Sequence, residues 1–294
     1  MDPKEELLRF EALYDTGYDE KRASRQEAWD RRAQNWDRKY REESERRLHE
    51  IRVRDTAAWL RERGLLGPEQ DVADVGCGPG RYVAEFARTA RSVLGTDISS
   101  RMTEYGERYC REQGLNNVRF QAVDFRKADV AALGWEGCFD LAYSSITPAV
   151  SGLQGLNNLI AISRAWCFNA SFVFSENALY TDIMQTLFGR QPRRHNASHS
   201  HWFYELFSLL WYRGYYPESH YYKQYREQSV PADRATAERY ADFLLEENEL
   251  TEENIRRILR FLEERADAEG LITEISDCWY GWLLWDVRDR HTRV

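Results

Sequence analysis

The chain lacks several features that mark common classes of protein. Its 294 residues contain no apolar run of about 18 residues, the length that a membrane-spanning helix needs. The first residues, MDPKEELLRF, are acidic and lack the apolar region of a secretory signal peptide. The five cysteines are scattered with no C-x-x-C pair, which indicates neither a disulfide framework nor a zinc ribbon. We therefore expect a reduced, cytoplasmic protein without a membrane partner.

A net positive charge is also lacking. The chain has 41 Lys and Arg against 49 Asp and Glu, a formal net charge of −8. General binding of nucleic acids rests on clustered Lys and Arg that neutralise phosphates. The N-terminal region is rich in charge but nearly balanced in sign, as expected of solvated helix faces rather than of a basic arm. We expect no DNA partner.

What the chain does have is a regular alternation of short apolar runs and helical segments between Gln70 and Glu176. The runs are DVADVG, SVLGTDI, NVRFQAVD, FDLAYSS and ASFVFSE. Strands that alternate with helices predict a parallel sheet with helices on both faces. Hydrophobic residues make up 43% of the chain, enough for a sizeable core.

The flanking regions predict mainly helices. Residues 1–66 have helical patterns, and side chains at spacings of four, three and four share one helix face: Trp29, Ala33, Trp36 and Tyr40. After Glu176 an irregular stretch leads to an aromatic helix that begins near His201. A strand follows in ESHYYKQYREQ, a helix begins at Thr251, and LITEISDCWYGWLLWDV predicts two strands with a bend at Gly281.

We divide the chain into an N-terminal helical cap over residues 1–66 and one α/β domain over residues 67–294. Helical insertions are expected in the second part at about 177–200 and 231–269.

The segment DVGCGPGRY follows a predicted strand and opens a predicted helix. Its glycines, Gly76, Gly78 and Gly80, allow a tight turn and the close approach of a ligand. A helix N-terminus beside the turn favours negative charge or hydrogen-bond acceptors. The dinucleotide fingerprint would require glycine where this chain has Arg81, so a dinucleotide site is not indicated.

This segment resembles motif I of the class I S-adenosylmethionine-dependent methyltransferases, and further signals follow in the family's order. Asp97, after the second strand, matches the acid that accepts hydrogen bonds from both ribose hydroxyls. Met102 matches the position that packs on the adenine. Asp124, after the third strand, matches the acid that reads the adenine amino group, and Phe125 is its neighbour.

The resemblance covers residues 70–176. It implies an α/β fold: a Rossmann-like seven-stranded, mostly parallel sheet with an antiparallel last strand, plus a helical cap. It also implies S-adenosyl-L-methionine as the cofactor. The cofactor-binding residues that it implies are Asp74, Gly76, Cys77, Gly78, Gly80, Asp97, Ile98, Met102, Asp124, Phe125 and Ser144. For Asp74, capping of the glycine loop through backbone N–H groups is an alternative. For the whole turn, the alternative is an α/β domain whose glycine loop only reverses the chain.

The chemistry of this cofactor asks little of the protein beyond positioning, which can supply on the order of 7–11 kcal/mol of barrier reduction. A general base is needed only for a protonated nucleophile, so we assign no catalytic residue. Family members line the transfer site near Ser144-Ser145. The segment SSITPAV lacks the Pro-Pro-aromatic motif of amide- and base-directed N-methyltransferases, which disfavours adenine-N6 or glutamine methylation. Ser145 or Thr147 could orient a substrate; alternatively, Thr147-Pro148 only ends the strand.

His195, His199 and His201 form a histidine cluster. A three-histidine metal site is conceivable, but the spacing matches no zinc signature and no cysteine lies nearby, so we expect no metal. Three roles stay possible for these histidines: a general base, a substrate contact, or a place in a solvated loop. The helix around Trp36 and Tyr40 resembles one that lies across the cofactor in many family members. We therefore add Trp36, Tyr40, His199 and His201 as candidate substrate contacts, with plain docking of the helix as the alternative.

These observations favour a methyltransferase with a small-molecule acceptor, whose N, O or S atom stays open, and direct in-line methyl transfer. A capped, aromatic and acidic pocket suits a small molecule better than a polymer. The alternatives are a protein or RNA methyltransferase, and a regulatory protein that binds the cofactor without turnover. The sequence does not indicate an oligomeric state.

Overall fold

The computed structural model describes residues 2–16, 26, 29–30, 43–191 and 195–291. Its strands are β1 (Asp71–Val75), β2 (Ser92–Asp97), β3 (Val118–Ala122), β4 (Phe139–Ser145), β5 (Ser163–Asn177), β6 (Glu218–Pro231) and β7 (Leu271–Asp286). Its α-helices are α1 (Pro3–Thr16), α4 (Glu43–Glu62), α5 (Arg81–Ala87), α6 (Ser100–Glu112), α7 (Gly152–Ile162), α8 (Ala178–Phe188), α9 (His195–Tyr212), α10 (Arg234–Leu244) and α11 (Glu252–Glu263). Two short 3-10 helices are η1 (Pro148–Val150) and η2 (Glu247–Glu249).

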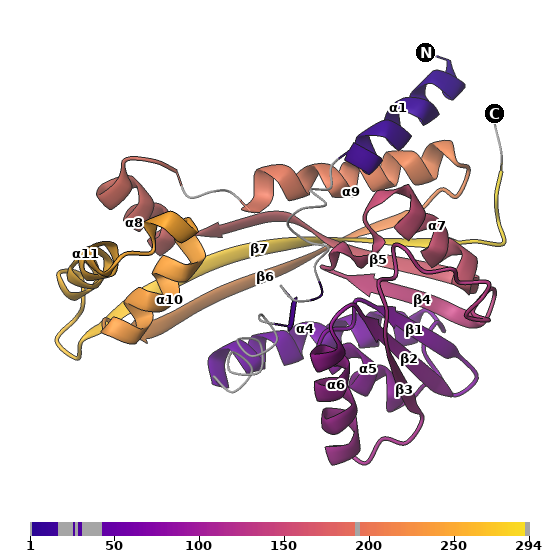
Figure 1. The fold of residues 1–294 in the computed structure, drawn as a ribbon, viewed down its shortest axis with the longest axis horizontal. Coiled ribbons are helices and arrows are strands. Elements are labelled where there is room, and N and C mark those ends of the chain that lie inside the picture. Colours follow the sequence, from indigo (N-terminus) through magenta and orange to yellow (C-terminus); the bar gives the residue numbers. More distant parts are fainter. Residues whose placement is uncertain (1, 17–25, 27–28, 31–42, 192–194, 292–294) are drawn as a thin grey trace. The chain divides into compact units, whose positions relative to one another are not determined.

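The described strands form one seven-stranded sheet with the order β3-β2-β1-β4-β5-β7-β6 (Figure 1). Strands β1 to β5 pair in parallel, and β7 runs antiparallel to its neighbours (Figure 1). This arrangement confirms the predicted fold class. The strand order reverses between β1 and β4, and ligands of open α/β sheets bind beyond the carboxyl ends of the strands at such a point.

Strands β1 and β4 lie at the centre of the parallel part of the sheet. Val72, Ala73, Leu141, Ala142 and Tyr143 are completely buried. Helices cover both faces of a parallel sheet, so its central strands must be apolar on both sides. That requirement explains the continuous apolar runs from which these strands were predicted.

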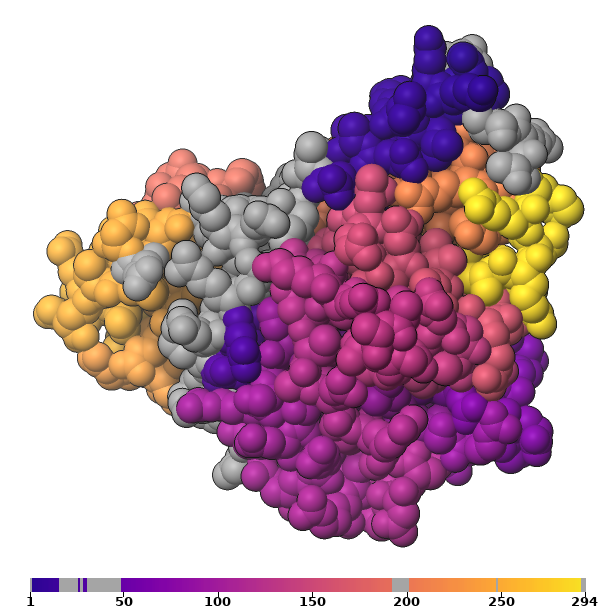
Figure 2. All heavy atoms as spheres, turned by 45° about the vertical axis from the view of Figure 1, so that its right-hand side comes forward, coloured from indigo at the N-terminus to yellow at the C-terminus, as the bar shows by residue number. Residues whose placement is uncertain are grey.

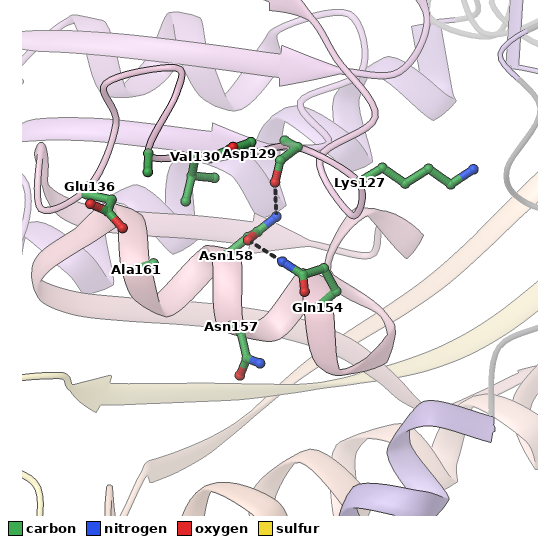
Figure 3. Close-up of a pocket in the computed structure, with 10 residues that line it drawn as sticks. Lys127, Asp129, Val130, Glu136, Gln154, Asn157, Asn158 and Ala161 are labelled. Atoms are coloured by element: carbon green, nitrogen blue, oxygen red, sulfur yellow. Dashed lines mark hydrogen bonds between the residues drawn. The ribbon is translucent and has the colours of Figure 1, made fainter.

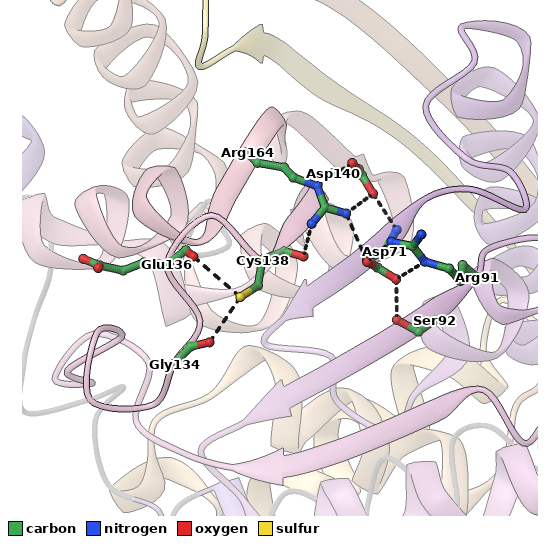
Figure 4. A network of polar contacts seen from close by, with 8 residues as sticks. All are labelled: Asp71, Arg91, Ser92, Gly134, Glu136, Cys138, Asp140 and Arg164. Carbon is green, nitrogen blue, oxygen red and sulfur yellow. Dashed lines mark hydrogen bonds and ion pairs between the residues drawn. The ribbon is translucent and has the colours of Figure 1, made fainter.

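An ion-pair network joins the amino ends of four parallel strands (Figure 4). Asp71 of β1 pairs with Arg91, which precedes β2, and with Arg164 of β5 at 3.0 Å. Arg164 also pairs with Asp140 of β4 at 2.6 Å, and its Nη1 donates to the Cys138 carbonyl at 3.0 Å. The hydrogen bond from Arg91 holds the pKa of Asp71 well below its usual range. The network therefore fastens the strands at the edge remote from their carboxyl ends.

The chain divides into two compact units. The first comprises residues 1–171, 204–220 and 282–294, and it contains the parallel strands. The second comprises Phe172–Phe203 and Tyr221–Gly281, and its core joins α8, α10 and α11 through residues such as Ile183, Tyr240 and Phe261.

Helix α1 packs on other helices of the first unit. The ring of Phe10 contacts Tyr204 and Tyr212 of α9 at 5.7 and 5.6 Å between centroids. The Asp15 carboxylate accepts a hydrogen bond from the Leu153 N–H at the start of α7, at 3.0 Å. Figures 1 and 2 both show α1 (indigo) beside the C-terminal half of α9 (orange). Among the described residues, no helix combines the length and the apolar character needed to span a membrane.

Two expectations about the C-terminal half are wrong. Gly281 does not separate two strands, because β7 continues through it from Leu271 to Asp286. The glycine is needed for packing: a Cβ atom there would lie 2.4 Å from the Phe203 ring. Helix α9 begins at His195, not near His201. Its first residues, HNASHS, carry no apolar periodicity, so the sequence pattern reveals only the later turns.

Candidate cofactor site

The glycine turn follows β1 and leads directly into α5. The N–H groups of Gly76 and Cys77 both donate to the Thr96 carbonyl of β2 at 2.8 Å, and the Gly80 N–H donates to the Cys77 carbonyl at 3.1 Å. Gly76, Gly78 and Gly80 have φ values of 73°, 53° and 73°. Side chains other than glycine rarely adopt this left-handed region, so the sequence dictates the path of the turn.

The three glycines differ in what surrounds them. A Cβ atom on Gly76 would lie 2.0 Å from Thr147 Oγ1, and one on Gly80 would lie 2.8 Å from the Phe120 ring. Both glycines are therefore required by neighbouring side chains. A Cβ atom on Gly78 would meet no atom within 4 Å. Gly78 is the point at which the turn faces open space, as expected where a ligand approaches the backbone.

Asp97 ends β2 and holds this turn. Its carboxylate accepts hydrogen bonds from the Gly78 N–H and the Ser99 N–H, both at 2.9 Å. Burial raises the pKa of Asp97, while these hydrogen bonds act in the opposite direction, together with one from the Ile98 N–H. A carboxylate has about four acceptor positions. With three N–H donors bound, Asp97 keeps about one acceptor position for a hydroxyl donor such as one of a ribose.

Asp74 is the least satisfied acid of the site. Its side chain is buried, and its Oδ2 atom finds no hydrogen-bond partner among the described residues. Burial and the nearby charge of Asp97 raise the pKa of Asp74 well above its usual value. A buried polar atom without a partner costs free energy. Its presence beside the glycine turn fits a ligand that brings a donor or a positive charge.

The alternative role of Asp74, as a cap of the glycine loop, finds no hydrogen bond in the structure. The N–H groups of the turn have other partners: Thr96 for Gly76 and Cys77, and Cys77 for Gly80. The Gly78 N–H donates to Asp97. The described contacts therefore do not support the capping role, and contact of Asp74 with the cofactor stays a prediction.

Asp30 is a residue near the site that the sequence analysis missed. The Ser99 hydroxyl donates to the Asp30 carboxylate, and Ser99 Oγ also caps α6 by accepting from the Met102 N–H at 3.3 Å. The charge of Asp30 contributes to the raised pKa of Asp97. No local pattern singles out this acid in a charged helix. Trp36 and Tyr40, to which the sequence drew attention, lie outside the described residues.

The candidates for the adenine end lie on the neighbouring segments. Met102 is buried in the first turn of α6, and Phe125 is buried after β3. Asp124 lies 3.6 Å from Arg126 and 3.8 Å from Lys127 in two ion pairs. The Val123 N–H donates to the Asp97 carbonyl at 2.8 Å, which brings the ends of β2 and β3 together. These side chains therefore follow strand ends on the same edge of the sheet.

The end of β4 contains the candidates for the transfer site. Ser144 is completely buried, and its hydroxyl donates to the Phe168 carbonyl at 3.2 Å and accepts from Asn169 at 2.9 Å. Thr147 starts η1, where its hydroxyl accepts from the Ala149 N–H at 3.2 Å. Between them, Ser145 is half-buried and Ile146 has a φ of 50°. A non-glycine residue in this region is strained, and such strain gathers at functional sites.

The histidine cluster is only partly described. His195 and His199 lie in α9, but their side chains are outside the described ones, and His201 is exposed. Among the described residues, no group of three or more His, Cys, Asp or Glu is arranged to hold a metal ion.

The thiols near the site are not activated. Burial, with the charges of Asp74 and Asp97, raises the pKa of the Cys77 thiol well above its usual value. Burial also raises the pKa of Cys110 to about 11 and raises that of Cys167. Only the thiolate is a nucleophile, so these three cysteines stay inert near neutral pH.

A separate hollow of about 460 Å³ lies between α7 and the loop of residues 127–136 (Figure 3). Its lining mixes apolar residues such as Val130 with polar ones such as Lys127, Asp129 and Asn158. Asn158 donates to the Ala128 carbonyl at 3.0 Å and accepts from Gln154 at 2.9 Å. None of the cofactor candidates lines the hollow, and its amide side chains satisfy groups of the protein itself.

Comparison with known proteins identifies the region around the glycine turn. A family model described as a methyltransferase domain matches residues 72–158. Two curated relatives are the 23S rRNA (uracil(1939)-C(5))-methyltransferases RlmD of Aeromonas hydrophila, 35% identical over 91 residues, and Aeromonas salmonicida, 31% identical over 121 residues. These matches cover 30% and 40% of this chain. The chain spans only 19% and 25% of the length of these relatives.

Solved structures with a similar arrangement are more distant in sequence. The YcgJ protein from Bacillus subtilis is 14% identical with a TM-score of 0.45, and the match covers 79% of this chain and 97% of that one. Magnesium protoporphyrin IX methyltransferase (ChlM) from Synechocystis PCC 6803, solved with bound SAH, is 18% identical with a TM-score of 0.47; the match covers 66% and 86%.

The family match begins inside β1 and ends in α7, so it includes the glycine turn, Asp97 and the segment after β3. The open position at Gly78 and the unpartnered oxygen of Asp74 fit the cofactor of this domain, S-adenosylmethionine. Residues 72–158 of the chain thus match a methyltransferase domain.

Proposed function

We propose that the protein transfers a methyl group from S-adenosylmethionine directly, in line, to a small-molecule acceptor. The observation that carries this proposal is the acidic carboxyl edge of the sheet, where Asp74, Asp97 and Asp30 lie near one another. A cluster of carboxylates favours a cationic cofactor and disfavours a polyanion such as RNA.

The residues of the chain would bind and orient the reactants. Asp97 would accept the ribose hydroxyls, Gly78 would allow the methionine end to approach the backbone, and Asp74 would accept from its ammonium group. Met102 and Asp124 would contact the adenine. When bound, the cofactor supplies a methyl group activated by a sulfonium. Alignment of an acceptor with that group is the main contribution that a protein needs to make.

The cap and the substrate contacts also remain proposals. Residues 1–66 would form a helical cap, with helical insertions at about 177–200 and 231–269 in the rest of the chain. Trp36, Tyr40, Ser145, Thr147, His199 and His201 would contact the acceptor. The packing of α1 on α7 and α9 supports a fixed position for the start of this cap in the first unit.

RNA is the second candidate acceptor, because the curated relatives named above act on 23S rRNA. Methylation of a base carbon through a covalent thiol adduct would need an accessible thiolate. Cys77, Cys110 and Cys167 are buried, and their raised pKa values keep the thiols protonated. These properties disfavour a covalent adduct at these three cysteines.

The test is a transfer assay with methyl-labelled cofactor on two substrate pools, a small-metabolite extract and total RNA. We expect label in a small product, which mass spectrometry then identifies. Label in RNA alone would reject the small-molecule acceptor. Tight binding of S-adenosylmethionine in calorimetry with no labelled product in either pool would favour a regulatory protein without turnover.

A further inference from the structure

Strand β6 ends the strand order, so among the described strands its only neighbour is β7. A long edge strand offers its backbone N–H and C=O groups to another chain, and proteins usually shorten such an edge or interrupt it with proline. Strand β6 is 14 residues long, and its single proline, Pro231, is its last residue. The other protection of an edge strand is charge, carried here by Lys223, Arg226 and Glu227, so a second strand can pair along Tyr221–Val230 where these charges meet opposite ones.

The burial of β6 alternates strictly along this part of the second unit. Tyr221, Lys223, Tyr225 and Glu227 are exposed, whereas the residues between them are half-buried. The side chains of Tyr221 and Tyr225 are 53% and 56% exposed. Large aromatic side chains at such exposure are enriched at protein interfaces. This face of the edge strand thus carries, in order, a tyrosine, a positive charge, a second tyrosine and a negative charge.

The order of these residues is self-complementary. In an antiparallel pair of identical strands, a two-fold axis passes beside one residue of each copy. A residue that precedes this position by some number of residues then lies opposite the partner's residue that follows it by the same number. With the axis at Tyr225, Lys223 of each copy lies opposite Glu227 of the other. An axis at Lys223, Arg226 or Glu227 would place like charges in direct opposition. An axis at Gln224 would leave all three charges without a charged partner. An axis at Tyr222 would place Arg226 opposite Glu218, a carboxylate that Arg63 already binds at 2.8 Å.

We propose that two copies of this chain associate edge to edge through β6, antiparallel, with Tyr225 opposite the partner's Tyr225. Two Lys223–Glu227 pairs flank the axis and select this register, because cross-strand pairs of opposite charge stabilise a sheet and like pairs destabilise it. Tyr225 Oη donates to Glu227 Oε2 at 3.0 Å, which keeps that carboxylate on the tyrosine side of the strand. Lys223 lies 3.6 Å from Asp277 of its own chain, but its side chain remains 53% exposed. Its ammonium group can therefore reach both Asp277 and the partner's Glu227.

Charge reversal tests the register. Sedimentation velocity on the full chain should show a dimer. Lys223→Glu and Glu227→Lys should each weaken dimerisation by about tenfold, because each turns two attractive pairs into two repulsive ones. The double variant Lys223→Glu/Glu227→Lys should restore it. Circular dichroism of each variant shows that the fold is kept. A monomeric wild type, or a double variant as weak as the single ones, would overturn the proposal.

Cysteine cross-linking tests the axis independently. Residues opposite one another in an antiparallel pair have Cα atoms about 4.5–5.5 Å apart, which a disulfide can join. Tyr225→Cys should therefore form covalent dimers on mild oxidation. Tyr221 lies on the same face but opposite the partner's Ser229. Tyr221→Cys should therefore form no more covalent dimer than the wild type does. Equal cross-linking of both variants, or capture of a strand from a different protein in place of a second copy, would reject the self-pairing.

Discussion

Strand β1 carries an aspartate near each end, and the two behave in opposite ways. Asp71, at the amino end, accepts hydrogen bonds from Arg91 and Ser92 and pairs with Arg164, and its pKa is lowered. Asp74, at the carboxyl end, is buried with an unpartnered oxygen, and its pKa is raised. A paired carboxylate stabilises the folded chain, whereas a buried unpaired one destabilises it. The carboxyl edge of the sheet is thus arranged for a ligand, and the amino edge for stability.

The largest expected effect is at the glycine turn. Gly78→Val should abolish binding of S-adenosylmethionine, because its side chain would fill the space that the ligand needs. Valine at a φ of 53° also strains the turn, but the sheet should survive, since a Cβ atom there meets nothing within 4 Å. Gly134→Val is a matched control: Gly134 has a φ of 68° and equally open surroundings but lies outside the turn. Calorimetry should show lost binding in the first variant and normal binding in the second.

Asp97→Ala should weaken cofactor binding by about 1.5–3 kcal/mol, the usual range for hydrogen bonds to a charged group. This corresponds to a roughly 10- to 150-fold rise in Kd. Asp71→Asn, at the other edge, should leave the affinity unchanged. Wild-type affinity in a folded Asp97→Ala protein would remove Asp97 from the cofactor site.

Asp74→Asn should stabilise the ligand-free protein by about 1–2 kcal/mol at mildly alkaline pH, since it removes the burial of an unpaired charge. The pH dependence follows from the direction of the shift. A raised folded-state pKa means that the folded chain binds more protons than the unfolded chain at pH values above about 4, so wild-type stability falls as pH rises. Urea unfolding at several pH values should show the advantage of the variant growing with pH. An advantage that stays constant with pH would contradict the assignment.

Asp71→Asn should cost about 1 kcal/mol of unfolding free energy, a modest value because the guanidinium groups of Arg91 and Arg164 are partly exposed. Here the pKa is lowered, so the contribution is present above about pH 4 and is lost as pH falls through the folded-state pKa. The difference between wild type and variant should therefore shrink below pH 4. The same unfolding series measures it, and a difference that grows on acidification would show that Asp71 is not stabilised by its arginines.

What the sequence could predict here was local. The apolar runs of β1 to β5 and the glycine turn depend on neighbouring residues, so the sheet and the turn were found. Gly281 was misinterpreted because its reason for being glycine, the Phe203 ring, lies far away in the chain. Asp30 was missed because its hydrogen bond with Ser99 spans 69 residues. Ser144 was placed correctly at the end of β4, but its partners on β5 could be known only from the sheet.

The smallest effect is expected at Asp30, whose carboxylate lies at the acidic carboxyl edge of the sheet. S-adenosylmethionine carries a sulfonium charge that S-adenosylhomocysteine lacks, so a nearby carboxylate favours the first over the second. Asp30→Asn should reduce this preference by about 0.5 kcal/mol, roughly twofold in the ratio of the two Kd values, as expected for a charge near the protein surface. Glu104→Gln, on an exposed position of α6, removes the same charge without contact with Ser99 and should leave the ratio unchanged. Calorimetry at low and high salt measures both ligands, and the effect of Asp30→Asn should diminish with salt because screening weakens a partly exposed charge. An equal loss of affinity for both ligands would mean that Asp30 acts only by positioning Ser99, and the acidic edge would then not select the charged cofactor.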